Sequence, residues 1–132
     1  MDRRTFLISS AAASAVPFAA QAAGFVDYTP GAVKAALAEG KTVLVDFSAV
    51  WCSTCKRQER VINALRATNP EYDSKLTFIK VDWDTYRTAE VTTSRNIPRR
   101  STLLLLRGEE ELGRIIAGTS QSQIKALMDI GL

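Results

Sequence analysis

The chain has 132 residues, of which 46% are hydrophobic and 23% are charged, with a net charge of +3. This length fits one domain, and the balance of residue types excludes collagen-like, disordered and coiled-coil chains. Because it has no His and only two Cys, it cannot carry a Ser-His-Asp triad, a Cys-His dyad, a His-ligated metal or a disulfide-rich scaffold, and its small charge gives no reason to expect nucleic acid as a partner.

Residues 1–22 have the three parts of a secretory signal peptide. The basic pair Arg3-Arg4 comes first, a weakly apolar stretch follows, and Ala20-Gln21-Ala22 fits an A-x-A cleavage site. The basic pair followed by Phe6-Leu7 resembles the twin-arginine signal, whose passengers cross the bacterial inner membrane folded. We therefore expect cleavage after Ala22, a mature domain over residues 23–132 and a periplasmic location. An ordinary Sec signal or an uncleaved anchor helix is the alternative.

The mature chain predicts alternating helices and strands. The first is a helix over 32–39, opened by Thr29-Pro30-Gly31 and closed by Gly40, and a strand over 42–47 follows it. A helix over 52–67 ends at Asn69-Pro70 and is followed by a strand over 76–82 and a polar helix over 85–95. Strands over 102–106 and 111–117 come next, and a final helix follows the capping sequence Ser120-Gln121-Ser122-Gln123. Strand–helix–strand connections predict parallel pairing, and the turn at 107–110 predicts an antiparallel hairpin. The expected fold class is α/β, with a mixed central sheet flanked by helices.

Both cysteines lie in one C-x-x-C motif, Cys52-Ser53-Thr54-Cys55, which follows a strand and opens a helix. The unpaired N–H groups and the positive dipole at a helix start stabilise a thiolate on Cys52. One helical turn brings Cys55 close enough to form a disulfide with it. We expect Cys52 to attack a partner's disulfide and Cys55 to resolve the mixed disulfide.

Two other roles for the cysteines fit less well. A zinc site needs four ligands, and one C-x-x-C without His does not supply them, so neither a metal nor another cofactor is expected. A purely structural disulfide closing so small a ring would constrain the unfolded chain little.

With these motifs in place, the chain resembles the thioredoxin family from roughly residue 43 to residue 128. The segments that carry the resemblance are Val45-Asp46-Phe47, Trp51-Cys52-x-x-Cys55-Lys56, Lys80-Val81-Asp82, Ile97-Pro98, the leucine strand and Gly118. The segment Cys55-Lys56-x-x-Glu59 is also similar to the periplasmic domains of transmembrane thiol:disulfide interchange proteins. The resemblance implies a thioredoxin-like fold.

Three residues beside the cysteines receive roles from this resemblance. Asp46 lies within an apolar strand, where burial of a carboxylate is costly and raises its pKa. In the thioredoxin pattern this residue takes the proton of the resolving Cys55 through water. Lys80 would tune Asp46, although it could instead only extend from a strand end into solvent. Trp51 would pack against the active-site turn as a positioning residue.

The proline that faces the cysteines in cis form in this family has two candidate positions. Matching residues 95–98 selects Pro98, with Ile97 beside it, and leaves Arg99-Arg100-Ser101 as an insertion. Counting back from the strand at 102 selects Ser101, which would not be cis because a non-proline cis bond costs about 2.5–4 kcal/mol. We favour Ile97 and Pro98 as the partner-binding residues. Arg99 and Arg100 would then favour acidic partners, or else form only a solvated loop.

The sequence thus predicts an exported, monomeric thiol:disulfide oxidoreductase that reduces protein disulfides. The dipeptide Ser53-Thr54 lacks the His found in strong oxidants, which favours a more reducing pair. Electrons would come from a membrane thiol:disulfide interchange protein. The alternatives are a disulfide oxidase or isomerase, a non-catalytic thioredoxin-like assembly or binding factor, and a metal-delivery protein. Retention of Cys52, Cys55 and Asp46 argues against a role in binding alone.

Overall fold

A computed structural model describes residues 24–132, and the predicted signal peptide lies outside these described residues. The elements are β1 (Val26–Asp27), α1 (Ala32–Ala38), β2 (Thr42–Ser48), α2 (Ser53–Thr68), α3 (Glu71–Lys75), β3 (Leu76–Asp82), α4 (Trp83–Tyr86), α5 (Glu90–Thr93), β4 (Thr102–Arg107), β5 (Glu110–Ile116) and α6 (Gln121–Ile130). None of the helices between residues 24 and 132 is long and apolar enough to cross a membrane.

The five strands form one mixed sheet in the order β1-β3-β2-β4-β5. β1 and β2 run parallel to β3, whereas β4 runs antiparallel to both β2 and β5. The predicted α/β fold, the parallel pair joined by α2 and the β4–β5 hairpin are confirmed. The expectation of parallel pairing across the next strand–helix–strand connection is wrong, because β4 is antiparallel to its neighbour.

The register explains the reversed direction of β4. Asp82 at the end of β3 pairs with Ser48, and Thr102 at the start of β4 pairs with Phe47. The end of β3 and the start of β4 therefore both lie beside the C-terminal end of β2. The sequence predicts one helix over 85–95, but the structure has two four-residue helices, α4 and α5, which do not carry the chain back along the sheet. The returning strand is antiparallel as a result.

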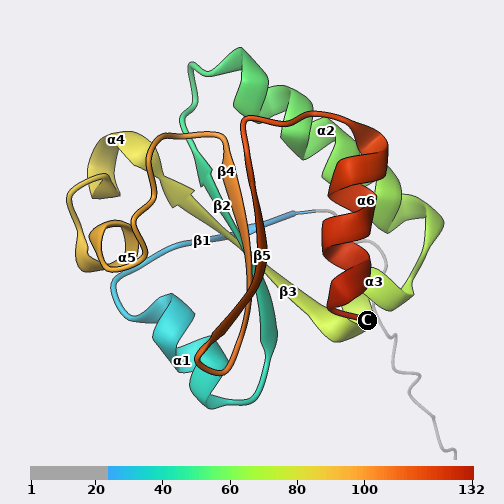
Figure 1. The fold of residues 1–132 in the computed structure, drawn as a ribbon, viewed down its shortest axis with the longest axis horizontal. Coiled ribbons are helices and arrows are strands. Elements are labelled where there is room, and N and C mark those ends of the chain that lie inside the picture. The colour runs from blue at the N-terminus through green and yellow to red at the C-terminus, as the bar shows by residue number, and fades with distance from the viewer. Residues whose placement is uncertain (1–23) are drawn as a thin grey trace, which may run out of the picture.

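Helices cover both faces of the sheet, with α2, α3 and α6 on one face and α1, α4 and α5 on the other (Figure 1). Side chains that alternate along β2 divide between two cores, so that Leu44 packs with α2, α3 and α6 while Val45 and Phe47 pack with α1 and α5. By the same alternation, Asp46 lies on the α2 face. It is fully buried there.

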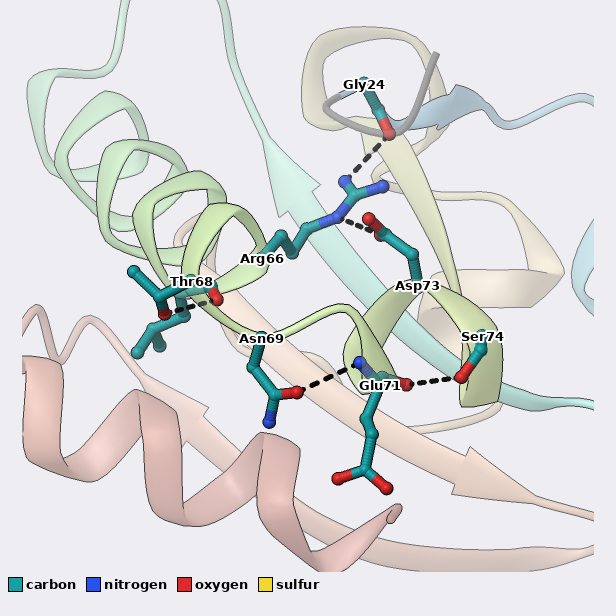
Figure 2. A network of polar contacts seen from close by, with 8 residues as sticks. Gly24, Arg66, Thr68, Asn69, Glu71, Asp73 and Ser74 are labelled. Atoms are coloured by element: carbon teal, nitrogen blue, oxygen red, sulfur yellow. Dashed lines mark hydrogen bonds and ion pairs between the residues drawn. The ribbon is translucent and has the colours of Figure 1, made fainter. Parts of the chain in front are cut away.

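Arg66 joins the end of α2 to the start of the described chain (Figure 2). Its Nε donates to Asp73 of α3 at 2.6 Å, and its Nη1 donates to the carbonyl oxygen of Gly24 at 2.9 Å. The guanidinium carbon also lies 3.9 Å from the ring centroid of Phe78. A buried Arg requires such partners, and α3 supplies one of them. The sequence does not predict α3, because Pro70 fits a helix end there, whereas Pro70 is also the N-cap of this next short helix.

Candidate active site

The loop between β2 and α2 places Cys52 at the N-cap of α2. The backbone N–H of Cys55 donates to the Cys52 sulfur at 3.1 Å, and the N–H of Lys56 donates to the Cys52 carbonyl oxygen at 3.1 Å. The Cys52 sulfur therefore takes the position of a capping side chain, where unpaired helix N–H groups favour a negative charge. Both cysteines are free thiols and both are buried, Cys55 completely.

Ser101 lies against both sulfurs from the loop before β4. Its Oγ is 3.2 Å from the Cys52 sulfur and 3.0 Å from the Cys55 sulfur. Ser101 is itself fully buried and has a φ of +66°, in the left-handed region. The backbone N–H of Ser101 donates to the Phe47 carbonyl oxygen at 2.7 Å, which joins this loop to the end of β2. One hydroxyl group therefore bridges the two thiols.

The two thiols have opposite pKa shifts. Burial raises the pKa of Cys52, but hydrogen bonds from the Cys55 thiol, the Ser101 hydroxyl, the Cys55 backbone N–H and the Arg100 side chain outweigh it, so the pKa falls to about 7. Burial raises the pKa of Cys55, and its hydrogen bond to Cys52 raises it further. Near neutral pH the site thus holds one thiolate-forming sulfur beside one sulfur that stays protonated.

Asp46 is a buried carboxyl group without a hydrogen-bond partner among residues 24–132. Burial raises its pKa to about 7, although the charge of Lys80 opposes this shift and the charges of Glu59 and Cys52 add to it. Lys80 is the register partner of Asp46 on β3 and donates to Glu59 on α2 at 2.8 Å. The half-buried Lys80–Glu59 pair therefore lies close enough to act on Asp46 electrostatically.

Trp51 and Arg100 stack beside Cys52. The guanidinium carbon of Arg100 lies 4.4 Å from the Trp51 ring centroid, a cation–π contact. The indole Nε1 of Trp51 donates to Asp84 of the α4 segment at 2.8 Å. Trp51 is 57% exposed, so its ring forms part of the surface around the buried cysteines. It holds the active-site loop against two neighbouring segments, and no chemical role follows from its position.

Between residues 24 and 132 there is no cluster of three or more His, Cys, Asp or Glu side chains that could hold a metal ion. The Cys52–Cys55 pair alone supplies two of the four ligands that a tetrahedral zinc site requires. Two adjacent thiols, one of which forms a thiolate near neutral pH, are suited to dithiol–disulfide exchange.

The sequence profile of the thioredoxin family, described as "Thioredoxin", matches residues 25–130. The chain belongs to the thioredoxin family. It is 34% identical over 87 residues to Thioredoxin H2-1 of Oryza sativa subsp. japonica, covering 66% of this chain and 59% of that protein. It is 33% identical over 109 residues to a thioredoxin of Buchnera aphidicola, covering 81% of this chain and 94% of that protein. The chain thus spans less than two thirds of the rice relative's length and almost all of the bacterial one.

Solved structures agree with the family. A crystal structure of Trxlp from Edwardsiella tarda superposes with a TM-score of 0.66 and 39% sequence identity, covering 80% of this chain and 97% of that one. The thioredoxin-like fold is therefore supported by sequence and by structure.

The residue that faces the cysteines in the structure is Ser101, whereas the sequence predicts Pro98. The Ser101 hydroxyl contacts both sulfurs, which favours aligning this loop by counting back from β4. Pro98 lies in the loop three residues earlier, and no peptide bond between residues 24 and 132 is cis. Ile97 is 8% exposed and packs in the core on the α1 face, so its side chain supports the loop and does not form a partner-binding surface.

Gln58 is a site residue that the sequence analysis missed. It is fully buried, and its Nε2 donates to the carbonyl oxygens of Ser101 at 3.0 Å and Gly118 at 2.8 Å. It thereby ties α2 to the loop that carries Ser101. Its spacing from Cys55 and Ile62, three residues after the first and four before the second, places it on the buried helix face and could have identified it.

Proposed function

We propose that the protein is an exported thiol:disulfide oxidoreductase that reduces protein disulfides. The observation that carries this proposal is the pair of opposite pKa shifts on two thiols that one hydroxyl bridges: Cys52 forms a thiolate near neutral pH, and Cys55 remains protonated. A nucleophilic thiolate beside a second thiol held in reserve is what stepwise reduction of a disulfide requires.

The reaction has two exchange steps. The Cys52 thiolate attacks one sulfur of the partner's disulfide, which forms a mixed disulfide and releases the other partner sulfur as a thiolate. Cys55 then loses its proton and attacks the Cys52 sulfur, which releases the second partner thiolate and leaves a Cys52–Cys55 disulfide. Two electrons pass to the partner, and its two thiolates take up protons according to the pH.

Asp46 is proposed as the acceptor of the Cys55 proton, acting through water. The carboxyl group is fully buried on the sheet face that α2 covers, and its pKa of about 7 lets it accept and return a proton near neutral pH. Lys80 lowers the pKa of Asp46 and Glu59 raises it, so this ion pair would set how readily the proton is taken.

The proposal also covers the electron donor that restores the two thiols and the compartment in which the protein acts. A dithiol on a membrane thiol:disulfide interchange protein would attack the Cys52–Cys55 disulfide and restore both thiols by the same exchange in reverse. The basic pair Arg3-Arg4 and the Ala20-Gln21-Ala22 sequence support export by the twin-arginine route, and we propose that the protein acts in the periplasm as a monomer.

Reduction of a model protein disulfide, such as the interchain bonds of insulin, tests the activity directly. With dithiothreitol as the electron source, the mature protein should accelerate the reaction, and Cys52→Ala should abolish the acceleration. In a separate reaction without dithiothreitol, pre-reduced Cys55→Ala should accumulate mixed disulfides that are visible on non-reducing gels, because the resolving thiol is gone. Trapping by Cys52→Ala in place of Cys55→Ala would contradict the assigned order of the two thiols.

Export is tested separately in bacterial cells. Replacing Arg3 and Arg4 with Lys should leave unprocessed precursor in the cytoplasm, while the same protein with the pair intact should be processed. Normal processing of the double variant would contradict the twin-arginine route and leave the enzymatic proposal untouched.

A further inference from the structure

We propose that Arg100, stacked on Trp51 beside Cys52, selects partner disulfides that carry a carboxylate next to the attacked cysteine. This inference rests on the proposed reductase function and names the class of disulfide that the site prefers.

The position of Arg100 places its charge at the point of attack. Its guanidinium carbon lies 4.4 Å from the ring of Trp51, the residue directly before Cys52. Arg100 also directly precedes Ser101, whose hydroxyl lies 3.2 Å from the Cys52 sulfur. A partner whose sulfur reaches Cys52 must therefore bring its neighbouring residues close to this guanidinium.

No carboxylate of residues 24–132 neutralises the charge of Arg100, whose anionic neighbour is the Cys52 thiolate to which its side chain donates a hydrogen bond. Between residues 24 and 132 no carboxylate forms an ion pair with it, and its Nε is buried without a hydrogen-bond partner. Asp84, the acid that contacts Trp51, accepts a hydrogen bond from the indole N–H of Trp51 and forms no ion pair with Arg100. The guanidinium is thus held in place by stacking and by its hydrogen bond to Cys52, and no carboxylate of residues 24–132 competes with a partner's carboxylate for it.

A carboxylate is the group that this arrangement fits best. A guanidinium presents N–H donors in a planar fork that matches the two oxygens of a carboxylate. Stacking on an aromatic ring fixes the plane of the fork, so less side-chain entropy is lost when a partner binds. Val50 and Trp51, the two residues before Cys52, are 79% and 57% exposed, so a partner segment that carries a Glu or Asp beside its cysteine can pack on them.

Two disulfide-bonded peptides that differ only in Glu or Gln beside the attacked cysteine provide the test. We expect the mature protein to reduce the Glu peptide with a kcat/KM about three- to tenfold higher at low salt, and Arg100→Gln to bring this ratio close to one. Because Arg100 also stabilises the Cys52 thiolate, Arg100→Gln slows both reactions, and this shared effect cancels in the ratio. Arg100→Lys, which keeps the charge and loses the fork, should give an intermediate ratio.

The control is Arg60→Gln, which removes the same charge from an exposed position on α2 and should keep the preference of the unmodified protein. Equal rates for the two peptides in the unmodified protein would overturn the inference while leaving the reductase function intact, as would a preference that survives Arg100→Gln. Failure to reduce either peptide would overturn the proposed function itself, and this inference with it.

Discussion

The hydroxyl oxygen of Ser101 lies 3.0 Å from the sulfur of Cys55, at the position that faces the cysteines. The same oxygen lies 3.2 Å from the Cys52 sulfur. The Ser101 N–H is bonded to Phe47 and its carbonyl oxygen to Gln58, so the backbone fixes where the hydroxyl points. A hydroxyl held there stabilises a thiolate on Cys52 by donating a hydrogen bond to it.

Removing this hydroxyl should raise the pKa of Cys52 above about 7. In Ser101→Ala the thiolate loses one hydrogen bond while the burial that raises the pKa remains. The pH dependence of alkylation of Cys52 by iodoacetamide measures this pKa, and its midpoint should move to higher pH. The redox potential should become more negative, because the reduced form loses stabilisation that the disulfide form never had.

The glycine variant at the same position separates the hydroxyl from the backbone. The φ of +66° strains Ser and Ala alike but not Gly, so Ser101→Gly relieves strain while also removing the hydroxyl. We expect both variants to raise the pKa of Cys52 in the same direction. A raised pKa in Ser101→Ala with an unchanged one in Ser101→Gly would assign the effect to backbone conformation.

Asp46→Asn should stabilise the fold in a pH-dependent way. The pKa of Asp46 is about 7 in the folded chain and about 3.8 when unfolded, so between these values the folded state holds a proton that the unfolded state has lost. Asp46 therefore destabilises the protein increasingly as the pH rises from about 4 to 7, by at most about 4 kcal/mol. Denaturant unfolding of the disulfide form should show little gain for Asp46→Asn at pH 4 and the full gain at pH 8.

The same variant should slow resolution of the mixed disulfide at pH 7, by about 100-fold or less because the proton passes through water. Rapid acid quenching at successive times measures the rate at which the mixed disulfide disappears. If neither stability nor resolution changes, Asp46 has no part in the site.

Lys80 and Glu59 should shift the pKa of Asp46 in opposite directions. Lys80→Gln removes the positive charge that lowers this pKa, so the pKa should rise. Glu59→Gln removes a negative charge that raises it and leaves Lys80 unpaired, so the pKa should fall. Carbon-13 NMR of the Asp46 carboxyl group across pH 5–9 reports both, and a shift of the same sign in the two variants would rule out this electrostatic account.

Much of the fold could be predicted from the sequence because its signals are local. The apolar runs at β2, β3 and β4 and the Ser120 cap of α6 lie where the patterns place them. The direction of β4 could not be predicted, since it depends on whether the segment before it is one helix or two short ones. The hydrogen bond from the Thr92 hydroxyl to the Tyr86 carbonyl oxygen joins the two short helices, and no sequence pattern predicts it.

The site was predictable where spacing alone fixes it and not where two distant segments meet. Cys52 and Cys55 follow from one motif on one helix start. Ser101 reaches them from 46 residues beyond Cys55, and the sequence allows two alignments of its loop, of which the one that selects Pro98 is favoured until contacts are known. Gln58 was not predicted because a polar residue in a helix usually faces solvent, whereas here its amide nitrogen donates to two carbonyl oxygens in the core.

The equilibrium of the Cys52–Cys55 pair with a glutathione buffer tests the central claim most directly. Because the pKa of Cys52 is about 7, we expect a potential near that of thioredoxin, about −270 mV, so that the protein donates electrons to partner disulfides. A potential near about −120 mV would contradict the account, because a pair that oxidising would insert disulfides into its partners.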